Sequence, residues 1–171
     1  AFASAHQSNF RPGDPLRIAI VAQDPQELQQ RSRLAAGTIA KPEARVAREE
    51  KGIFFHELNA DAAAKPPRVA FLFPGHGSQY AGMLESLVEQ FPPAGEVMGQ
   101  IDRILDGLGY HRFSTVAWDR PDTLGTDVWQ TQLALLVADT IVLVSLKSLG
   151  VEPDCVSGHS YGEFPALVAA G

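Results

Sequence analysis

The sequence contains a single cysteine among its 171 residues, and this scarcity limits the classes of protein that it can belong to. One thiol, Cys155, cannot build the internal disulfide framework on which small secreted domains depend. The length is sufficient for a domain to bury its own core without such bridges. We therefore expect a protein of the reducing cytoplasm.

Clusters of basic residues are also absent. Lysine and arginine together number 14 against 20 aspartates and glutamates, which gives a net charge of −6. Nucleic-acid-binding domains present a concentrated basic patch, and no such run of residues occurs here. We expect no nucleic-acid partner.

The signatures of common cofactors are missing as well. The histidines and the cysteine show no metal-ligand spacing, and no Walker loop is present. The stretch "GHGSQYAG" follows an apolar run but lacks the G-x-G-x-x-G register of dinucleotide-binding folds. We expect no metal and no tightly bound cofactor.

The first ten residues have neither a basic start nor an apolar run, so we predict no signal peptide in them. Residues 133–149, "LALLVADTIVLVSLKSL", form a long apolar stretch, but Asp139 and Lys147 are both costly in lipid. A helix that is apolar on nearly all sides is otherwise a buried core helix, and we predict no membrane contact. The chain does not begin with methionine, which indicates a piece of a longer protein.

The composition, 45% apolar and 20% charged, is that of a globular protein. Residues 17–22 and 52–58 are predicted strands, the first of them buried. A helix is predicted between them, with Asp24 as its N-cap and Pro25 at its first position. Residues 41–52 are charged and predict a loop or a frayed helix.

The stretch "NADAAAKPPR" has little periodicity and two prolines, so it predicts a boundary between residues 1–65 and residues 66–171. The second domain opens with "RVAFLF", residues 68–73, a run typical of a parallel-sheet strand. Two apolar stripes at helical spacing follow it. The first stripe comprises Leu84, Leu87, Val88 and Phe91, and the second Val97, Ile101, Ile104, Leu105 and Leu108.

A buried helix over residues 130–149 is predicted to end at Gly150, and a short strand, "CVS", follows it. A tight turn then leads into the helix "EFPALVAA". Strands that alternate with helices predict an α/β fold, with a small α/β domain before a parallel sheet flanked by helices.

The pentapeptide Gly158-His159-Ser160-Tyr161-Gly162 matches the G-x-S-x-G nucleophile elbow and lies between the predicted strand and helix. Small neighbours are needed there because Cβ atoms would collide with the strand and the helix. Such a turn points the Ser160 hydroxyl outward at a helix N-terminus, where a developing anion is stabilised. The alternative is that Ser160 only caps the helix, and the strand–turn–helix context favours the nucleophile.

An acyl-transfer serine also needs donors for an oxyanion. The backbone N–H of Tyr161, directly after the serine, is one candidate. The second candidate is the backbone N–H of His76, because "PGHGSQ" follows the first strand and its glycines allow close approach. A plain strand-to-helix turn remains the alternative for that loop.

No histidine has the pattern of a general base. His159 is more simply a packed or hydrogen-bonded turn residue whose side chain points away from Ser160, and His6, His56 and His111 carry no pattern. Glu163 is a first-turn carboxylate favoured by the helix dipole rather than a triad acid. The base normally follows the nucleophile in a hydrolase-like sheet, so the machinery is incomplete in this chain.

Two motifs, "FPGHGSQYAGM" and "GHSYGEFPALVAAG", stand about eighty residues apart. Together they resemble the malonyl-CoA:acyl carrier protein transacylase family, specifically the acyltransferase domains of polyketide and polyunsaturated fatty acid synthases. The segment from "RIAIVA" to "KGIFFHEL" resembles the linker domain between ketosynthase and acyltransferase. The "KGIFF" segment and the tyrosine after the serine are most similar to iterative enediyne-type synthases.

The resemblance implies a ping-pong transfer in which Ser160 takes a malonyl group from a coenzyme A thioester. Ser160 then passes it to the phosphopantetheine thiol of an acyl carrier protein. His76 and Tyr161 match the residues whose N–H groups form the oxyanion hole, although the family usually has glutamine where His76 stands. "QLAL", residues 132–135, departs from the family's "QPAL".

The resemblance also implies parts that have no counterpart here, namely a base histidine, an arginine for the malonyl carboxylate and a ferredoxin-like subdomain. We therefore expect an N-terminal fragment that is inactive alone. Its expected partners are the carrier protein, the ketosynthase domain and the remainder of the acyltransferase domain. An α/β-hydrolase such as a thioesterase and a non-catalytic docking module remain alternatives.

Overall fold

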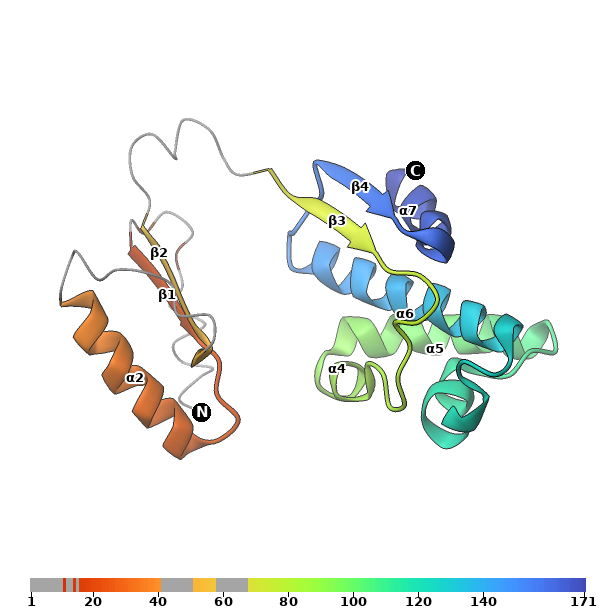
Figure 1. Cartoon of the computed structure of the whole chain (residues 1–171), viewed down its shortest axis with the longest axis horizontal. Coiled ribbons are helices and arrows are strands. Elements are labelled where there is room, and N and C mark those ends of the chain that lie inside the picture. The colour runs from red at the N-terminus through yellow and green to blue at the C-terminus, as the bar shows by residue number, and fades with distance from the viewer. Residues whose placement is uncertain (1–10, 12–13, 15, 41–50, 58–67) are drawn as a thin grey trace. The chain divides into compact units, whose positions relative to one another are not determined.

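The computed structural model describes residues 11, 14, 16–40, 51–57 and 68–171, and the chain divides into two compact units, residues 1–67 and 68–171. The charged segment 41–50 and most of the boundary stretch lie outside the described residues. An α/β fold is confirmed, since helices accompany short strands in both units (Figure 1).

The first unit has two antiparallel strands, β1 (Leu16–Ile20) and β2 (Ile53–Glu57), with helix α2 (Pro25–Ile39) between them in the chain. The predicted N-cap is confirmed, because the Asp24 side chain accepts a hydrogen bond from the Glu27 N–H at 2.8 Å. The Arg31 side chain joins the helix to the sheet through the Val21 carbonyl and the Glu27 carboxylate.

The prediction that the first strand is buried is wrong for the described residues. Leu16 and Ile18 of β1 are 42% and 41% exposed. The strand has one partner, β2, in a two-stranded sheet, and such a sheet leaves much of its apolar surface uncovered.

The second unit is built on a parallel pair of strands, β3 (Ala70–Phe73) and β4 (Cys155–Gly158), in the register Ala70↔Cys155 to Phe73↔Gly158. The predicted parallel strand is thus confirmed. Between the two strands the chain forms α4 (Glu85–Gln90), α5 (Pro92–Gly107) and α6 (Val128–Ser148), and α7 (Glu163–Ala170) follows β4. Parallel strands require such a crossover, and α6 runs alongside them in Figure 1.

Helix α6 is the core helix that the sequence predicts. Among the described residues it is the one helix long and apolar enough to cross a membrane, but its side chains fill two clusters. Ile141 is fully buried in the cluster that α6 forms with residues of α5 and the segment after it, and Leu143 packs with Phe71 and Phe73 of β3. Gly150 follows the helix at φ +78°, as a C′ residue does.

The helix stripes are confirmed in part. All four residues of the first stripe pack on the core cluster, although α4 itself begins only at Glu85. In the second stripe Ile104 and Leu108 are 59% and 65% exposed, so these two residues do not belong to the buried face of the helix. Ile104 lies about 100° around the helix from the buried Leu105, and Leu108 lies beyond the helix end.

The segment between α5 and α6 was not predicted. It contains a π-helical turn, Thr115–Asp119, which is anchored by polar groups. The buried Asp102 carboxylate accepts from the Phe113 N–H at 2.8 Å and the Ser114 hydroxyl at 3.3 Å. These bonds satisfy the oxygens of a buried side chain and hold the segment on α5.

Candidate active site

Ser160 stands at the turn between β4 and α7 with a backbone φ of +55°, in the left-handed region. That region costs a residue with a Cβ about 1 kcal/mol or more, and such strain concentrates at functional sites. The serine is exposed to solvent rather than packed in hydrocarbon. The turn therefore presents the Ser160 hydroxyl outward.

The turn requires glycine at two positions, Gly158 and Gly162, because neither position has room for a side chain. A Cβ on Gly158 would lie 2.3 Å from the Gly162 carbonyl oxygen. A Cβ on Gly162 would lie 2.2 Å from the carbonyl oxygen of Phe73, which shows how closely the turn approaches β3. The two glycines of G-x-S-x-G are thus required because the backbone segments around them lie too close together for any side chain.

The loop after β3 forms a second tight turn over residues 75–78. The Gly75 carbonyl accepts from the Ser78 N–H at 3.2 Å and from the Ser78 hydroxyl at 2.8 Å. Gly77 has φ +106°, which suits the third position of a type II turn. His76 therefore occupies an exposed corner of this turn.

The two turns pack against each other. A Cβ on Gly75 would lie 2.4 Å from the His159 carbonyl oxygen, 3.1 Å from Ser160 Cβ and 3.2 Å from the Tyr161 nitrogen. The His159 N–H donates to the Phe73 carbonyl at 3.0 Å and joins the serine turn to the end of β3. His76 thus directly follows Gly75, the residue that packs against Ser160.

The backbone N–H groups at positions 76 and 161 are free to serve a ligand. Within the described part of the chain, neither of them donates to an acceptor. Both lie on turns beside Ser160, and the N-terminal end of α7 adds a partial positive charge. Two unpaired donors next to an exposed hydroxyl can bind a developing oxyanion.

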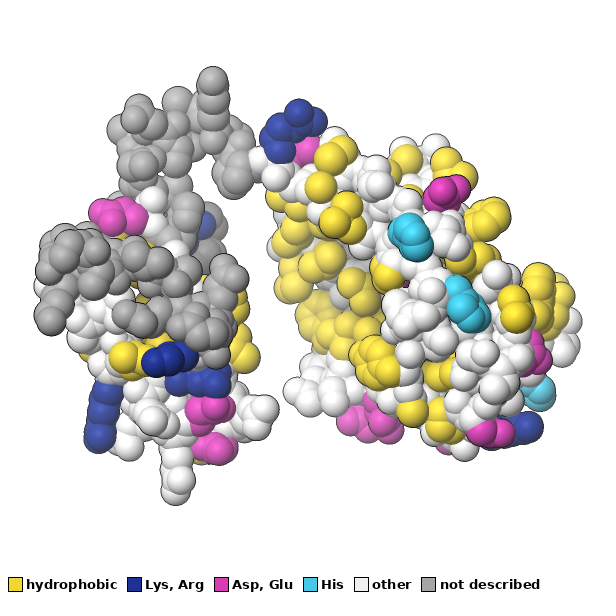
Figure 2. All heavy atoms as spheres, in the orientation of Figure 1, with side chains coloured by type: hydrophobic (Ala, Val, Ile, Leu, Met, Phe, Trp, Pro, Cys, Tyr) yellow, Lys and Arg dark blue, Asp and Glu magenta, His cyan; other side chains and the backbone are white. Residues whose placement is uncertain are grey.

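His159 is a hydrogen-bonded turn residue, which is one of the two roles expected for it. Its backbone is hydrogen bonded on both sides, because the Gly162 N–H also donates to its carbonyl at 3.0 Å, and its side chain is exposed. Figure 2 shows histidine side chains at the surface of the unit 68–171, in keeping with the exposure of His76, His111 and His159. His6 and the side chain of His56 lie outside the described residues.

The carboxylates of Glu163 and Asp139 differ in environment. Glu163 is the first residue of α7 and is exposed, as expected of a first-turn acid. Asp139, in the middle of α6, has one buried oxygen without a hydrogen-bond partner among the described residues, and burial raises its pKa to about 6. Across residues 11, 14, 16–40, 51–57 and 68–171, no group of three or more histidine, cysteine or acidic side chains could hold a metal ion.

The profile of the acyl transferase domain family matches residues 70–171, the whole span that contains both turns. The chain belongs to the acyl transferase domain family. Its relatives include the malonyl CoA-acyl carrier protein transacylase of Bacillus subtilis (strain 168), 39% identical over 104 residues that cover 61% of this chain and 32% of the relative. They also include the non-reducing polyketide synthase cla3 of Cladosporium cladosporioides, 35% identical over 158 residues, or 92% of this chain and 7% of the synthase.

Solved acyl transferases have the same fold. The acyltransferase domain from the second module of the salinomycin polyketide synthase superposes with a TM-score of 0.65 at 28% identity, over 91% of this chain and 33% of that one. A complex described as PlMCAT:AntF, a type II acyl-carrier protein with its malonyl-transacylase, gives a TM-score of 0.54 at 36% identity, with coverage of 61% and 33%. The chain spans about a third of the length of the transacylase and of these structures.

Two residues that hold the second turn of this acyl transferase unit were missed in the sequence. The Gln79 side chain accepts from the Gly77 N–H at 2.8 Å, and the Ser78 hydroxyl closes the turn. A signal was available for Ser78, since serine side chains often bond to backbone groups three or four positions before them.

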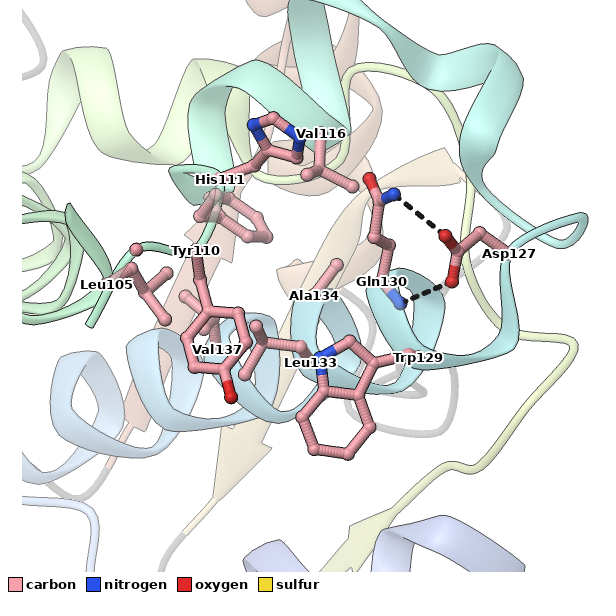
Figure 3. A pocket seen from close by; sticks show the side chains of 12 residues that line it. Leu105, Tyr110, His111, Val116, Asp127, Trp129, Gln130, Leu133, Ala134 and Val137 are labelled. Atoms are coloured by element: carbon pink, nitrogen blue, oxygen red, sulfur yellow. Dashed lines mark hydrogen bonds between the residues drawn. The ribbon is translucent and has the colours of Figure 1, made fainter.

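A separate cavity of about 240 Å³ lies between α5, the loop after it and the start of α6 (Figure 3). Leu133, Ala134 and Val137 line it from α6, and the rings of Tyr110 and Trp129 meet with centroids 6.1 Å apart. None of its lining residues belongs to the two turns of the serine site.

Proposed function

We propose that Ser160 is the nucleophile of an acyltransferase that moves a malonyl-type group from coenzyme A to an acyl carrier protein in polyketide biosynthesis. The observation that carries this proposal is the exposed serine at φ +55° beside two unpaired N–H donors on adjoining turns. The names of the transacylase relatives support the choice of acyl donor and acceptor.

In the first half-reaction the Ser160 oxygen attacks the thioester carbonyl and loses its proton to a base. The N–H groups of His76 and Tyr161 bind the oxyanion, the carbon–sulfur bond breaks and the coenzyme A thiol leaves with a proton. In the second half-reaction the phosphopantetheine thiol attacks the serine ester, and the Ser160 oxygen regains its proton. No tightly bound cofactor takes part in either step.

We assign residues 1–65 to the linker between ketosynthase and acyltransferase, and residues 66–171 to the first part of the acyltransferase. The relatives that cover both units, a polyketide synthase and a polyketide synthase acyltransferase domain, support this assignment. The partners in this proposal are the carrier protein, the ketosynthase domain and the rest of the acyltransferase, with the base and the carboxylate-binding arginine supplied by that rest. We place the protein in the cytoplasm.

The test uses a longer polypeptide that continues this chain through a whole acyltransferase domain, with labelled malonyl-CoA and a carrier protein. We expect label on the carrier protein and a malonyl ester on Ser160, both lost in Ser160→Ala. The 171-residue chain alone is expected to transfer nothing. Release of free malonate without labelling of the carrier protein would instead indicate a thioesterase. Carrier loading that persists in Ser160→Ala would indicate that this chain is a non-catalytic docking module.

A further inference from the structure

The peptide unit that joins Gly75 to His76 is held by a residue of its own turn. Its carbonyl oxygen, that of Gly75, accepts two hydrogen bonds from Ser78, from the N–H at 3.2 Å and from the hydroxyl at 2.8 Å. Its N–H, that of His76, donates to no acceptor among the described residues. One end of this peptide unit is thus doubly bonded, and the other end is free.

The geometry of the peptide unit links these two ends. The Gly75–His76 bond is trans, so its C=O and N–H groups lie in one plane and point in opposite directions. Since Ser78 bonds the carbonyl into the turn, the His76 N–H points out of the turn. The position of this peptide unit is fixed as well, because Gly75 is buried and a Cβ there would lie 3.1 Å from Ser160 Cβ.

The bonds to the Gly75 carbonyl also affect the strength of the donor. Hydrogen bonds in a chain polarise one another, so a carbonyl that accepts a bond makes the N–H of the same peptide unit a stronger donor. Of the two bonds on the Gly75 oxygen, the one from the Ser78 hydroxyl comes from a side chain. The backbone bond is open to every residue except proline at position 78, so a substitution there can remove the contribution of the hydroxyl alone.

We propose that Ser78 is a positioning residue for acyl transfer at Ser160, because its hydroxyl aims and strengthens the His76 N–H as an oxyanion donor. This inference rests on the oxyanion role of His76 proposed above. Ser78 acts through the Gly75 carbonyl and not through contact with the substrate. An oxyanion donor binds the developing anion more strongly than the neutral thioester carbonyl, so a weaker donor lowers the rate of acylation and leaves binding of the acyl donor unchanged.

Two substitutions of nearly equal volume isolate the hydroxyl, because Ser78→Thr retains it and Ser78→Val replaces it by a methyl group. Formation of the malonyl ester on Ser160 is followed in a single turnover, with the longer acyltransferase polypeptide and malonyl-CoA. For Ser78→Val we expect the rate at saturating malonyl-CoA to fall about fivefold, the worth of one hydrogen bond. The malonyl-CoA concentration that gives half of this rate should change by less than about twofold, and Ser78→Thr should restore the rate.

A second measurement does not depend on activity. In the isotope-labelled 171-residue chain, Ser78→Val should shift the amide resonance of His76 upfield, because the Gly75–His76 peptide unit is less polarised without the hydroxyl bond. Ser78→Thr should leave that resonance near its original position. A His76 resonance that stays unchanged in Ser78→Val would show that the hydroxyl does not act on this peptide unit and would overturn the inference.

The matched control is Ser148→Val. The Ser148 hydroxyl makes the same kind of bond, to the Ser145 carbonyl three positions before it at 2.8 Å, but it does so at the end of α6. We expect Ser148→Val to leave the acylation rate unchanged, whatever its effect on the melting temperature. A rate that falls as far in Ser148→Val as in Ser78→Val would assign the effect to general loss of stability and overturn the role of Ser78.

The remaining outcomes separate this inference from the proposed function. Acylation of Ser160 at equal rates in Ser78→Val and the unsubstituted protein would refute the role of Ser78 and leave the nucleophile in place. A rate that is lowered equally in Ser78→Val and Ser78→Thr would also refute it, since the hydroxyl would then not be the cause. Absence of any malonyl ester on Ser160 in the unsubstituted protein would refute the proposed function, and this inference with it.

Discussion

Ser160 has an unfavourable backbone conformation that the packing of its neighbours has to maintain. Its φ of +55° is natural for glycine and unfavourable for a residue with a Cβ, and the backbone around it is packed so closely that no Cβ fits at Gly75, Gly158 or Gly162. Strain of this kind persists only where the fold over-determines it.

Replacing Ser160 by glycine and by alanine separates strain from chemistry, because both changes remove the hydroxyl. We expect Ser160→Gly to be more stable than Ser160→Ala by about 1 kcal/mol, since only the glycine relieves the left-handed backbone. Urea unfolding of the 171-residue chain measures the difference. Equal stabilities would mean that the turn relaxes and is not strained.

Asp139 is a second residue whose environment costs stability, because one of its oxygens is buried without a partner among the described residues. Its pKa in the folded protein is about 6, above the ordinary value of 3.8, so the folded state holds the proton more tightly than the unfolded state does. This group therefore stabilises the protein most below about pH 4, and the contribution declines as the pH rises towards 6.

The isosteric variant Asp139→Asn tests this dependence. Since the side chain is only about half buried, we expect the stability gained by Asp139→Asn over the unsubstituted chain to grow by about 1 kcal/mol from pH 4 to pH 6.5. Denaturant unfolding at several pH values gives the difference directly. A difference that is constant over this range would show that Asp139 finds a partner in solution.

At the scale of elements, the sequence predicts what depends on local patterns. The cap of α2 at Asp24, the C′ glycine of α6 and the parallel strand 70–73 follow from side chains that act within a few positions. Burial of β1 was predicted wrongly, because an apolar run does not tell how many neighbours an element has. The π-helical turn depends on Asp102, eleven positions before its partner Phe113, and no local pattern reveals such a pairing.

Removing the Asp102 carboxylate should loosen the segment after α5. Asp102→Ala leaves the buried Phe113 N–H without an acceptor, and we expect a loss of about 2–3 kcal/mol and faster amide exchange over residues 113–119. Asp106→Ala is the matched control, since its carboxylate pairs with Arg112 at the surface and should leave the melting temperature unchanged. Comparable effects of the two changes would show that Asp102 has no special anchoring role.

At the scale of the whole molecule, the apolar clusters of the described residues lie in the second unit. Both of them, the one around Ile141 and the one that includes Phe71 and Phe73 of β3, consist of residues between 69 and 169. The candidate site is likewise contained in the second unit, where the sequence motifs predicted it. The contact between the two turns could not be predicted from the motifs, because it depends on the pairing of β3 with β4.

The second unit should therefore fold without the first. We expect residues 68–171 alone to give amide spectra that overlay those of the same residues in the 171-residue chain, with the same unfolding midpoint within experimental error. A loss of dispersion on removing residues 1–67 would show that the clusters depend on the first unit.

The parallel pairing of β3 and β4 has a consequence for how such a protein can change. The proposed oxyanion donors, the N–H groups of His76 and Tyr161, sit 85 positions apart in the chain. Each stands three residues after the last residue of its own strand, so their separation in space is independent of the length of the chain between them. Helices in that intervening stretch can grow, shrink or be exchanged without disturbing the hydroxyl. Deleting one residue from either strand would shift one turn past the other and dismantle the site in a single step.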